Sequence, residues 1–159
     1  MVQNLAYAPH QPSSSRPLDR AEAVCRDHNA RLTPIRRKVL EALYATDKPL
    51  GAYDLAEIVA PNGRRLAPIT VYRALDFLIE QGLAYRLASR NAYIASLHET
   101  ENREMAAFLI CENCGSVDEV TSQDLSREIA HLLSQNGFRL KSKVLEITGQ
   151  CAHCQGGTH

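Results

Sequence analysis

Residues 68–95 read PITVYRALDFLIEQGLAYRLASRNAYIA, and this stretch decides the fold of the first half of the chain. Pro68 suits the first position of a helix, because its φ is already helical and that position needs no N–H donor. Apolar residues then recur at helical spacing, at Val71, Leu75 and Leu78. Gly82 suits the position just beyond a helix end. Two short strand-like runs follow, at 83–87 and 92–95, and they predict a β-hairpin.

The residues upstream predict three more helices, each with an apolar face. They span residues 19–28, 35–44 and 52–60. Thr33 and Pro34 mark the start of the second of them. In the third, three residues are expected to face the core: Leu55, Ile58 and Val59. Short helices followed by a hairpin are typical of a winged helix-turn-helix, which we place at residues 19–96, after a disordered Pro- and Ser-rich tail at 1–18.

The C-terminal part of the chain predicts a small second domain of α/β type, so the whole chain is expected to be α+β. Residues 98–104 are polar or charged, and 97–105 are predicted to be a linker, which leaves 106–159 for this domain. Strands are expected at 107–110 and 116–120, and one or two more within 138–148. Between them, a helix is predicted from its apolar residues Leu125, Ile129, Leu132 and Leu133. Thr121 and Asp124 resemble a capping box at its start.

Two Cys-x-x-Cys pairs flank this second domain, Cys111-Glu-Asn-Cys114 and Cys151-Ala-His-Cys154. Two residues between thiolates allow one tight turn to present both sulfurs to a single ion, and zinc accepts four sulfurs in a tetrahedron. Gly115 suits a turn whose backbone amides point at sulfur. A closed four-thiolate site leaves no open position for water. The pattern therefore predicts a structural zinc site, and it argues against a metal hydrolase or another enzyme.

The same cysteines leave a second interpretation open, that of a thiol redox protein. A redox pair normally opens a helix, which lowers the thiolate pKa, whereas Cys111 ends an apolar run and Cys114 precedes a glycine. No apolar run approaches the roughly 18 residues of a membrane span, and the N-terminus does not resemble a signal peptide. We therefore expect no membrane partner and a cytoplasmic location, where thiols stay reduced and available to metal. The lone Cys25 is predicted to be a core residue.

Charge and side-chain type point to a nucleic-acid partner for the first domain. Residues 1–96 hold 13 Lys and Arg against 9 Asp and Glu, whereas residues 97–159 hold 5 against 9. A basic half fits a polyanion. In helix-turn-helix proteins, the first residues of the recognition helix meet base edges, and here these are Thr70, Tyr72 and Arg73. Phosphate contacts are expected from Arg64, Arg65, Arg86 and Arg90.

Several stretches resemble the ferric uptake regulator family, and most of all its zinc uptake regulator branch. They include RLTPIRRKVL at 31–40, TVYRALDFLIEQG at 70–82, FLICENCG at 108–115 and GQCAHC at 149–154. The resemblance covers about residues 22–154. It implies a homodimer joined through the second domain, whose metal-loaded form binds a palindromic double-stranded DNA operator and represses metal-uptake genes. It also implies that Tyr53, Tyr72 and Arg73 contact DNA.

One departure from the family pattern concerns a second, regulatory zinc site. Members of the zinc branch bind it with His, Cys, His and Glu, at positions that here read Tyr85, Ser96, Glu104 and Glu119. His98 lies nearby in sequence, so the candidate set is His98, Glu104 and Glu119. Two alternatives stay open: a regulator with weak or different metal sensing, and one that no longer senses metal. A peroxide or iron sensor would need His and Asp ligands that the sequence does not offer.

Overall fold

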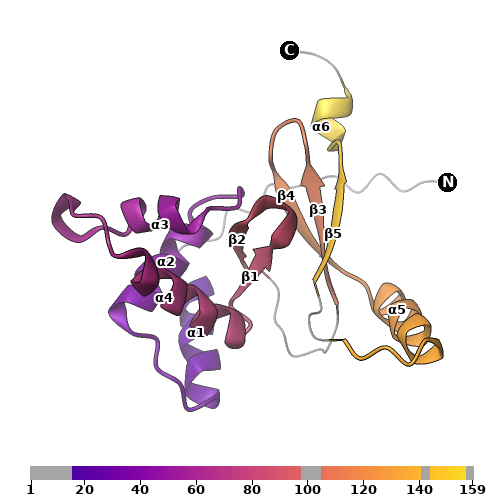
Figure 1. Cartoon of the computed structure of the whole chain (residues 1–159), viewed down its shortest axis with the longest axis horizontal. Coiled ribbons are helices and arrows are strands. Elements are labelled where there is room, and N and C mark those ends of the chain that lie inside the picture. Colours follow the sequence, from indigo (N-terminus) through magenta and orange to yellow (C-terminus); the bar gives the residue numbers. More distant parts are fainter. Residues whose placement is uncertain (1–15, 98–104, 141–143, 157–159) are drawn as a thin grey trace.

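The computed structural model of the chain describes residues 16–97, 105–140 and 144–156 (Figure 1). Its first half is helical and ends in a β-hairpin. The helices are α1 (Arg16–Asp27), α2 (Pro34–Tyr44), α3 (Ala52–Ile58) and α4 (Pro68–Glu80), with a 3-10 turn η1 (Pro61–Gly63) before α4. The hairpin strands are β1 (Ala84–Leu87) and β2 (Ala92–Ala95), joined by the 3-10 turn η2 (Ala88–Arg90). We call residues 84–95 the wing.

The helices pack around a first hydrophobic core. Its fully buried side chains include Leu40, Leu43, Leu55, Leu75 and Leu78. Pro34 and Pro68 occupy the first positions of α2 and α4, as their sequences predict. After α4 the chain turns at Gly82, whose φ of +70° is one that glycine adopts without strain. Burying these leucines removes apolar surface from water, which is the main favourable term in folding.

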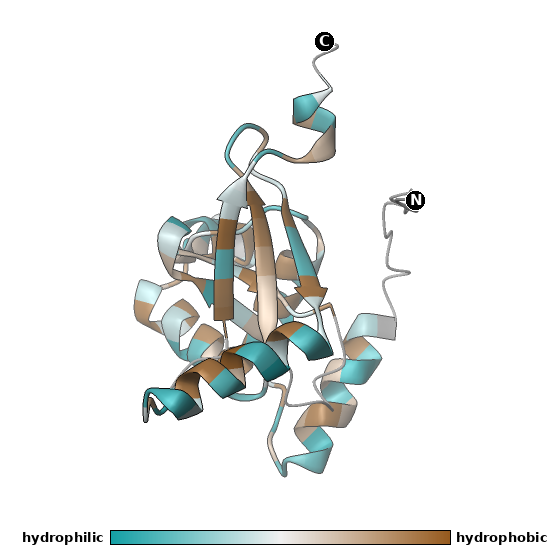
Figure 2. Cartoon of the chain, turned by 90° about the vertical axis from the view of Figure 1, so that its right-hand side faces the viewer, coloured by the Kyte–Doolittle hydropathy of each residue, from teal (hydrophilic) through white to brown (hydrophobic). Residues whose placement is uncertain are grey.

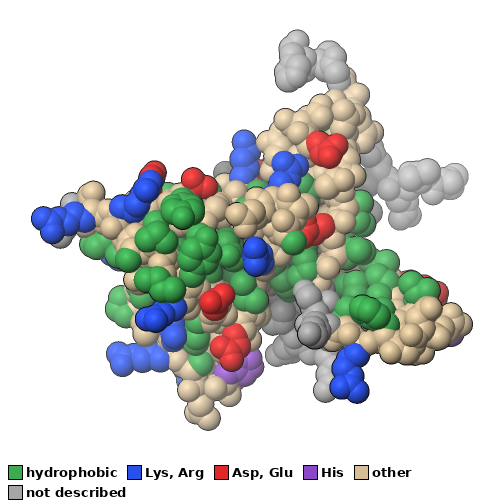
Figure 3. All heavy atoms as spheres, in the orientation of Figure 1, with side chains coloured by type: hydrophobic (Ala, Val, Ile, Leu, Met, Phe, Trp, Pro, Cys, Tyr) green, Lys and Arg blue, Asp and Glu red, His purple; other side chains and the backbone are tan. Residues whose placement is uncertain are grey.

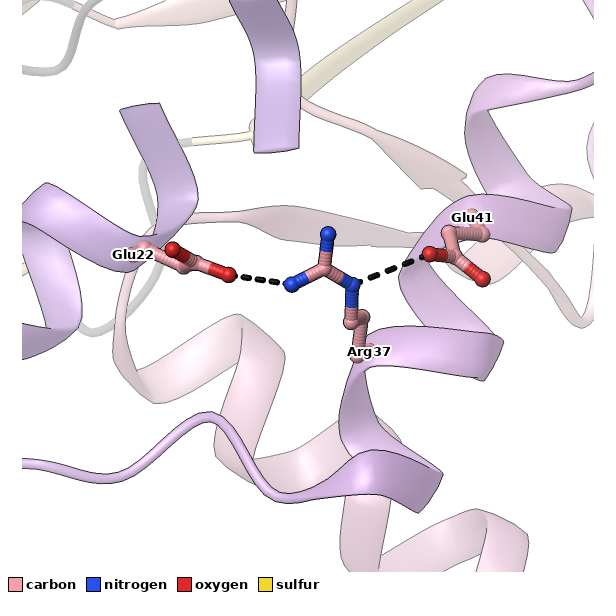
Figure 4. Close-up of polar contacts among 3 residues, drawn as sticks. All are labelled: Glu22, Arg37 and Glu41. Carbon is pink, nitrogen blue, oxygen red and sulfur yellow. Dashed lines mark hydrogen bonds and ion pairs between the residues drawn. The ribbon is translucent and has the colours of Figure 1, made fainter. Parts of the chain in front are cut away.

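An ion-pair bridge at the surface joins α1 to α2 (Figure 4). The Arg37 guanidinium lies between the carboxylates of Glu22 in α1 and Glu41 in α2. The Nε atom of Arg37 donates to Glu41 at 3.1 Å. These groups are well exposed to solvent, so the bridge contributes little to the stability of the fold.

The second half is built on a three-stranded sheet. Its elements are β3 (Ala106–Cys111), β4 (Val117–Thr121), α5 (Gln123–Gln135), β5 (Val144–Gly149) and α6 (Ala152–Gln155). The strand order is β4-β3-β5, in which β4 is antiparallel and β5 parallel to β3. Because β3 lies between β4 and β5, which run in opposite directions, the connection from β4 to β5 passes the start of β3 at one end of the sheet, and α5 lies in this connection.

The wing lies between the helices and this sheet (Figure 1) and contributes to two cores. Its residues Tyr93 and Ala95 belong to the helical core. Leu87 and Ile94 instead pack with Ala106, Phe108 and other residues of the sheet in a second core. The two halves are thus in direct contact through the hairpin. The domain boundaries at 19–96 and 106–159 stay a prediction, and most of the expected linker 97–105 lies outside the described residues.

The sheet face turned away from the wing and one side of α5 are apolar and uncovered (Figure 2). No residue of α5 is buried, although its sequence is strongly amphipathic. Large apolar side chains are exposed on the sheet at Leu109, Val120 and Ile147, on α5 at Leu132, and in the segment after α5 at Phe138 and Leu140. We call these residues the open apolar face. An uncovered apolar surface of this kind marks an interaction site.

The structure corrects several expectations. Helix α1 begins at Arg16, so the predicted tail 1–18 is too long, and its residues 1–15 lie outside the described part. Ile58 is 57% exposed instead of buried, because the inward stripe of α3 runs through Ala52, Leu55, Ala56 and Val59, and Ile58 lies beside that stripe. The cap of α5 is Ser122, whose hydroxyl accepts from the Leu125 amide at 3.3 Å, while Thr121 still belongs to β4. Within 138–148, a described strand begins only at Val144.

Among the described residues, no helix has the length and apolar character needed to span a membrane.

Candidate metal centre and nucleic-acid interface

The four predicted cysteine ligands come together at one end of the sheet. The Sγ atoms of Cys111, Cys114, Cys151 and Cys154, which we call the cysteine quartet, all lie within 4.8 Å of one another. Cys111 is the last residue of β3, and Cys151 follows β5 and precedes α6. Because β3 and β5 are parallel neighbours, their ends bring the two pairs together from 36 residues apart in sequence.

The distances between sulfurs fit a tetrahedral ion. Cys114 Sγ and Cys151 Sγ, which belong to different pairs, are 3.8 Å apart. Four sulfurs placed about 2.3 Å from a central zinc would be about 3.8 Å apart. All five cysteines are free thiols, so neither pair forms a disulfide. The arrangement thus fits zinc, and it disfavours two separate redox pairs.

Backbone amides of the first turn point at sulfur, as the position of Gly115 predicts. Gly115 has a φ of +77°, and its amide donates to the Cys111 carbonyl at 3.0 Å. Hydrogen bonds from the backbone of Cys114 and of Cys151 lower the pKa of Cys111 to about 6. The amide of Cys151 donates to Cys111 Sγ at 3.3 Å. Cys111 is therefore an anion at neutral pH, which is the form that binds metal.

Ser116 is a part of this site that the sequence analysis missed. Its hydroxyl lies 3.1 Å from Cys114 Sγ and is the main cause of the lowered pKa of that thiol. In the sequence, Ser116 is marked only as a hydroxyl residue two positions after Cys114. Such a residue is too common at this spacing to be recognised as part of a metal site. Cys154 behaves oppositely, because its hydrogen bond to Cys151 and the neighbouring sulfurs raise its pKa to about 12. Zinc binding must therefore release a proton from Cys154.

Of the predicted second metal site, only Glu119 lies among the described residues, so the site stays a prediction; the neighbouring family positions Tyr85 and Ser96 are described. Tyr85 and Ser96 hydrogen-bond each other, and burial, together with the Glu119 charge, raises the pKa of Tyr85. A neutral phenol and a serine hydroxyl are not among the usual zinc ligands. Glu119 Oε2 accepts from the Leu97 amide at 2.7 Å. His98 and Glu104 lie outside the described residues, and within those residues the cysteine quartet is the only cluster of metal ligands.

Arg20 on α1 also contacts the chain where it leaves the wing, and no sequence pattern predicts this contact. Its guanidinium donates to the Ser96 carbonyl at 2.9 Å and to the Leu97 carbonyl at 3.1 Å. The Tyr44 hydroxyl contacts the same Ser96 carbonyl at 3.4 Å. The side chains of Arg20 and Tyr44 thus hold the chain at Ser96 and Leu97, where it leaves the wing.

The residues predicted to contact DNA lie on α3, α4, the wing and the turn before α4. Figure 3 shows Lys and Arg side chains spread over the helical part of the molecule, on the left. Exposed side chains are found at Tyr53, Arg64, Arg65, Arg73, Arg86 and Arg90. Thr70 and Tyr72 are partly buried, and Tyr72 packs against the helical core. Their roles toward DNA stay predictions.

Two of these arginines have protein partners. Arg65 forms an ion pair with Glu57 of α3, and Arg86 donates to the Asn91 side chain at 3.3 Å. Asn91 itself has a left-handed φ of +48° at the tip of the wing. Arg65 is therefore partly neutralised, which makes it a weaker candidate for phosphate contact than Arg64 or Arg73.

Known proteins agree with this architecture. The chain is 36% identical over 137 residues to the zinc uptake regulation protein of Escherichia coli (strain K12), covering 86% of this chain and 80% of that protein. A structure of a zinc uptake regulator complexed with zinc and DNA superposes with a TM-score of 0.83 at 35% identity, covering 91% of this chain and 96% of the other. The holo form of XcZur gives 0.81 at 35% identity and covers 91% and 100%.

The chain superposes better on the complex with zinc and DNA and on holo XcZur than on the apo form of XcZur. The apo form of XcZur, also 35% identical, gives a TM-score of 0.52 and covers 89% of this chain and 97% of that one. In addition, residues 27–148 match the ferric uptake regulator family as a whole. On sequence and on structure alike, this chain belongs to the ferric uptake regulator family.

Proposed function

We propose that the protein is a zinc-responsive repressor that binds a palindromic double-stranded DNA operator as a homodimer in the cytoplasm and controls metal-uptake genes. The main support for this proposal is one structural observation. The chain superposes over 91% of its length on a zinc uptake regulator bound to zinc and DNA, and it has both a four-sulfur cluster and a winged helical unit. It acts by binding and not as an enzyme, since four thiolates leave no open metal position.

In this proposal each half has its own task. Residues 19–96 bind DNA, with α4 in the major groove, where Arg73 reads a base edge and Thr70 and Tyr72 position the helix. Residues 106–159 form the dimer and hold zinc, which ties the ends of β3 and β5 together when it is bound. A symmetric dimer presents two α4 helices at a fixed spacing, and that spacing selects a palindromic site.

The DNA contacts can be tested by comparing base-reading and phosphate-binding arginines. Arg73→Ala is expected to weaken binding roughly ten-fold or more, because a bidentate arginine–guanine pair contributes about 1–3 kcal/mol. Arg64→Ala should weaken binding similarly on every sequence and reduce the salt slope by about 1. The probe is a palindromic duplex selected by the wild-type protein from a random library, with affinity measured by fluorescence anisotropy at several salt concentrations.

Arg127→Ala serves as the control for these variants. Arg127 is exposed on α5, where it pairs with Asp124 at 3.0 Å, far along the chain from the winged unit. It removes the same charge and should leave DNA affinity within two-fold. Equal losses for Arg73→Ala and Arg127→Ala would contradict the assigned interface.

We expect about one tightly bound zinc per chain, because the described residues offer one complete ligand set. In this proposal the zinc response belongs to filling the cysteine quartet, so removing that zinc should weaken DNA binding. Zinc added beyond one ion per chain should change DNA affinity by less than about three-fold, since a ligand shifts an equilibrium only by its differential affinity for the two states. Elemental analysis of the purified protein and a zinc titration of DNA binding check both statements. Two chelator-resistant zinc ions per chain with a steep DNA response would instead favour a regulatory site that includes His98, Glu104 and Glu119.

A further inference from the structure

One row of three residues crosses the C-terminal sheet from edge to edge. Phe108 in β3 pairs with Glu119 in β4 and with Glu146 in β5. Residues directly opposite each other in a sheet point to the same face. Phe108 is fully buried in the core that the sheet shares with the wing, so the row faces the wing. We call Glu119, Phe108 and Glu146 the docking row.

Each member of the row contacts the wing or its exit. Glu146 accepts from the Ala88 amide at 2.7 Å and from the Ser89 amide at 3.1 Å, each with a different carboxylate oxygen, and the Ser89 hydroxyl also donates to it. Glu119 accepts from the Leu97 amide at 2.7 Å. Between them, the rings of Phe108 and Tyr85 meet edge to face, with centroids 5.0 Å apart.

The hydrogen bonds from the wing to Glu146 are strong enough to fix the position of the wing on the sheet. Hydrogen bonds from backbone amides to a carboxylate are roughly twice as strong as neutral ones. Although burial opposes ionisation, the bonds from Ser89 and Ala88 lower the pKa of Glu146, so it is charged at neutral pH. The wing has only four residues in each strand, and an isolated two-stranded hairpin is marginally stable. Its orientation must therefore come from what it packs against.

We propose that the docking row positions the wing, and through it the wing arginines Arg86 and Arg90. The DNA part of this inference rests on the proposed function, whereas the positioning itself does not. The two strands that carry Phe108 and Glu146 lead directly to Cys111 and Cys151. By holding the register of these strands, the cysteine quartet also sets the place of the row. Glu119 thus has a role in holding Leu97 that requires no metal.

Amide hydrogen exchange on the zinc-loaded full chain, without DNA, tests the positioning. Glu146→Ala removes all three bonds, and Ser89→Ala removes only the one from the hydroxyl. We expect the amides of Ala88 and Ser89 to exchange at least ten-fold faster in Glu146→Ala, with a smaller increase at Ala88 in Ser89→Ala. Amides of α4, such as that of Val71, should keep their wild-type rates, which a general loss of stability would not permit.

Two further variants make the exchange test specific. Glu128→Gln removes a carboxylate from α5 and should leave wing exchange unchanged. Glu146→Gln keeps one acceptor oxygen for the Ala88 amide but places an NH2 donor at the position that accepts from Ser89, so its wing exchange should lie between that of the wild type and that of Glu146→Ala. Wing exchange within two-fold of wild type in both Glu146 variants would overturn the proposal. The proposal would also be wrong if amide exchange became faster to the same extent in the wing and in α4.

Measurements of DNA binding then distinguish a failure of the proposed repressor function from a failure of the proposed role of the docking row. On the duplex selected by the wild-type protein, Glu146→Ala should lose about ten-fold in affinity and show a smaller salt slope, because Arg86 and Arg90 are no longer held in place. If the wild-type protein binds no duplex, the proposed function fails, while the exchange data still decide the positioning. If the wild-type protein binds and Glu146→Ala binds equally well, the link from the row to DNA is wrong.

Discussion

Cys111→Ser should release the zinc ion and lower the melting temperature by about 10 °C or more. The cysteine quartet joins the ends of β3 and β5, and structural zinc sites of this type contribute about 10 kcal/mol or more of apparent binding free energy in small domains. Loss of one thiolate leaves three, and a serine hydroxyl does not replace a sulfur anion at neutral pH. Differential scanning calorimetry and elemental analysis of the same sample measure both effects.

The matched control is Cys25→Ala. Cys25 is 2% exposed in the helical core, and burial raises the pKa of its thiol, so it behaves as a small apolar side chain. Its replacement should retain a full complement of zinc and cost about 1 kcal/mol through lost packing. If Cys111→Ser kept its zinc and its melting temperature, the four-thiolate assignment would be wrong. Treatment with a strong chelator should reproduce the Cys111→Ser effect in the wild-type protein.

Leu132→Glu should dissociate the proposed homodimer, with a dimerisation constant weakened by a hundred-fold or more. Leu132 is 58% exposed on α5, in the open apolar face that also includes Phe138 and Ile147. A charge introduced there would be buried without a partner in a dimer, at a cost of several kcal/mol. Because Leu132 is exposed in the single chain, the fold itself should survive. Analytical ultracentrifugation over a concentration series measures the change, and circular dichroism checks the fold.

Gln135→Glu provides the same charge change on the polar side of α5. Gln135 is exposed. Its side-chain Nε2 atom lies 3.0 Å from Nε2 of His131, one helical turn earlier in α5. This variant should sediment as the wild-type protein does. Since a palindromic site needs two α4 helices, Leu132→Glu should also bind the selected palindrome at least ten-fold more weakly while keeping affinity for a half-site. A Leu132→Glu protein that remains dimeric would move the interface away from the open apolar face.

The sequence predicted most elements because their signals are local. Proline at the first helical position, glycine after α4 and the period of the apolar residues each act within a few residues. The errors occurred where two local signals compete. Thr121 and Ser122 can both cap a helix, and only the pairing of Thr121 with Ala106 in the sheet decides between them. Ile58 and Val59 are both apolar and adjacent, so they cannot both lie on the inward stripe of α3, and only packing shows that Val59 is the buried one.

The sequence by itself determined the family, the winged unit and the four cysteines that we propose as zinc ligands, because each is encoded by residue types at fixed short spacing. Only the tertiary structure decided what Glu119 and Glu146 do. Their partners lie 22 and 57 or 58 residues away along the chain, and a carboxylate in a strand gives no sign of the amide it will meet. These hydrogen bonds depend on the register of the three strands and on the packing of the wing against them. Both are set only when the chain has folded.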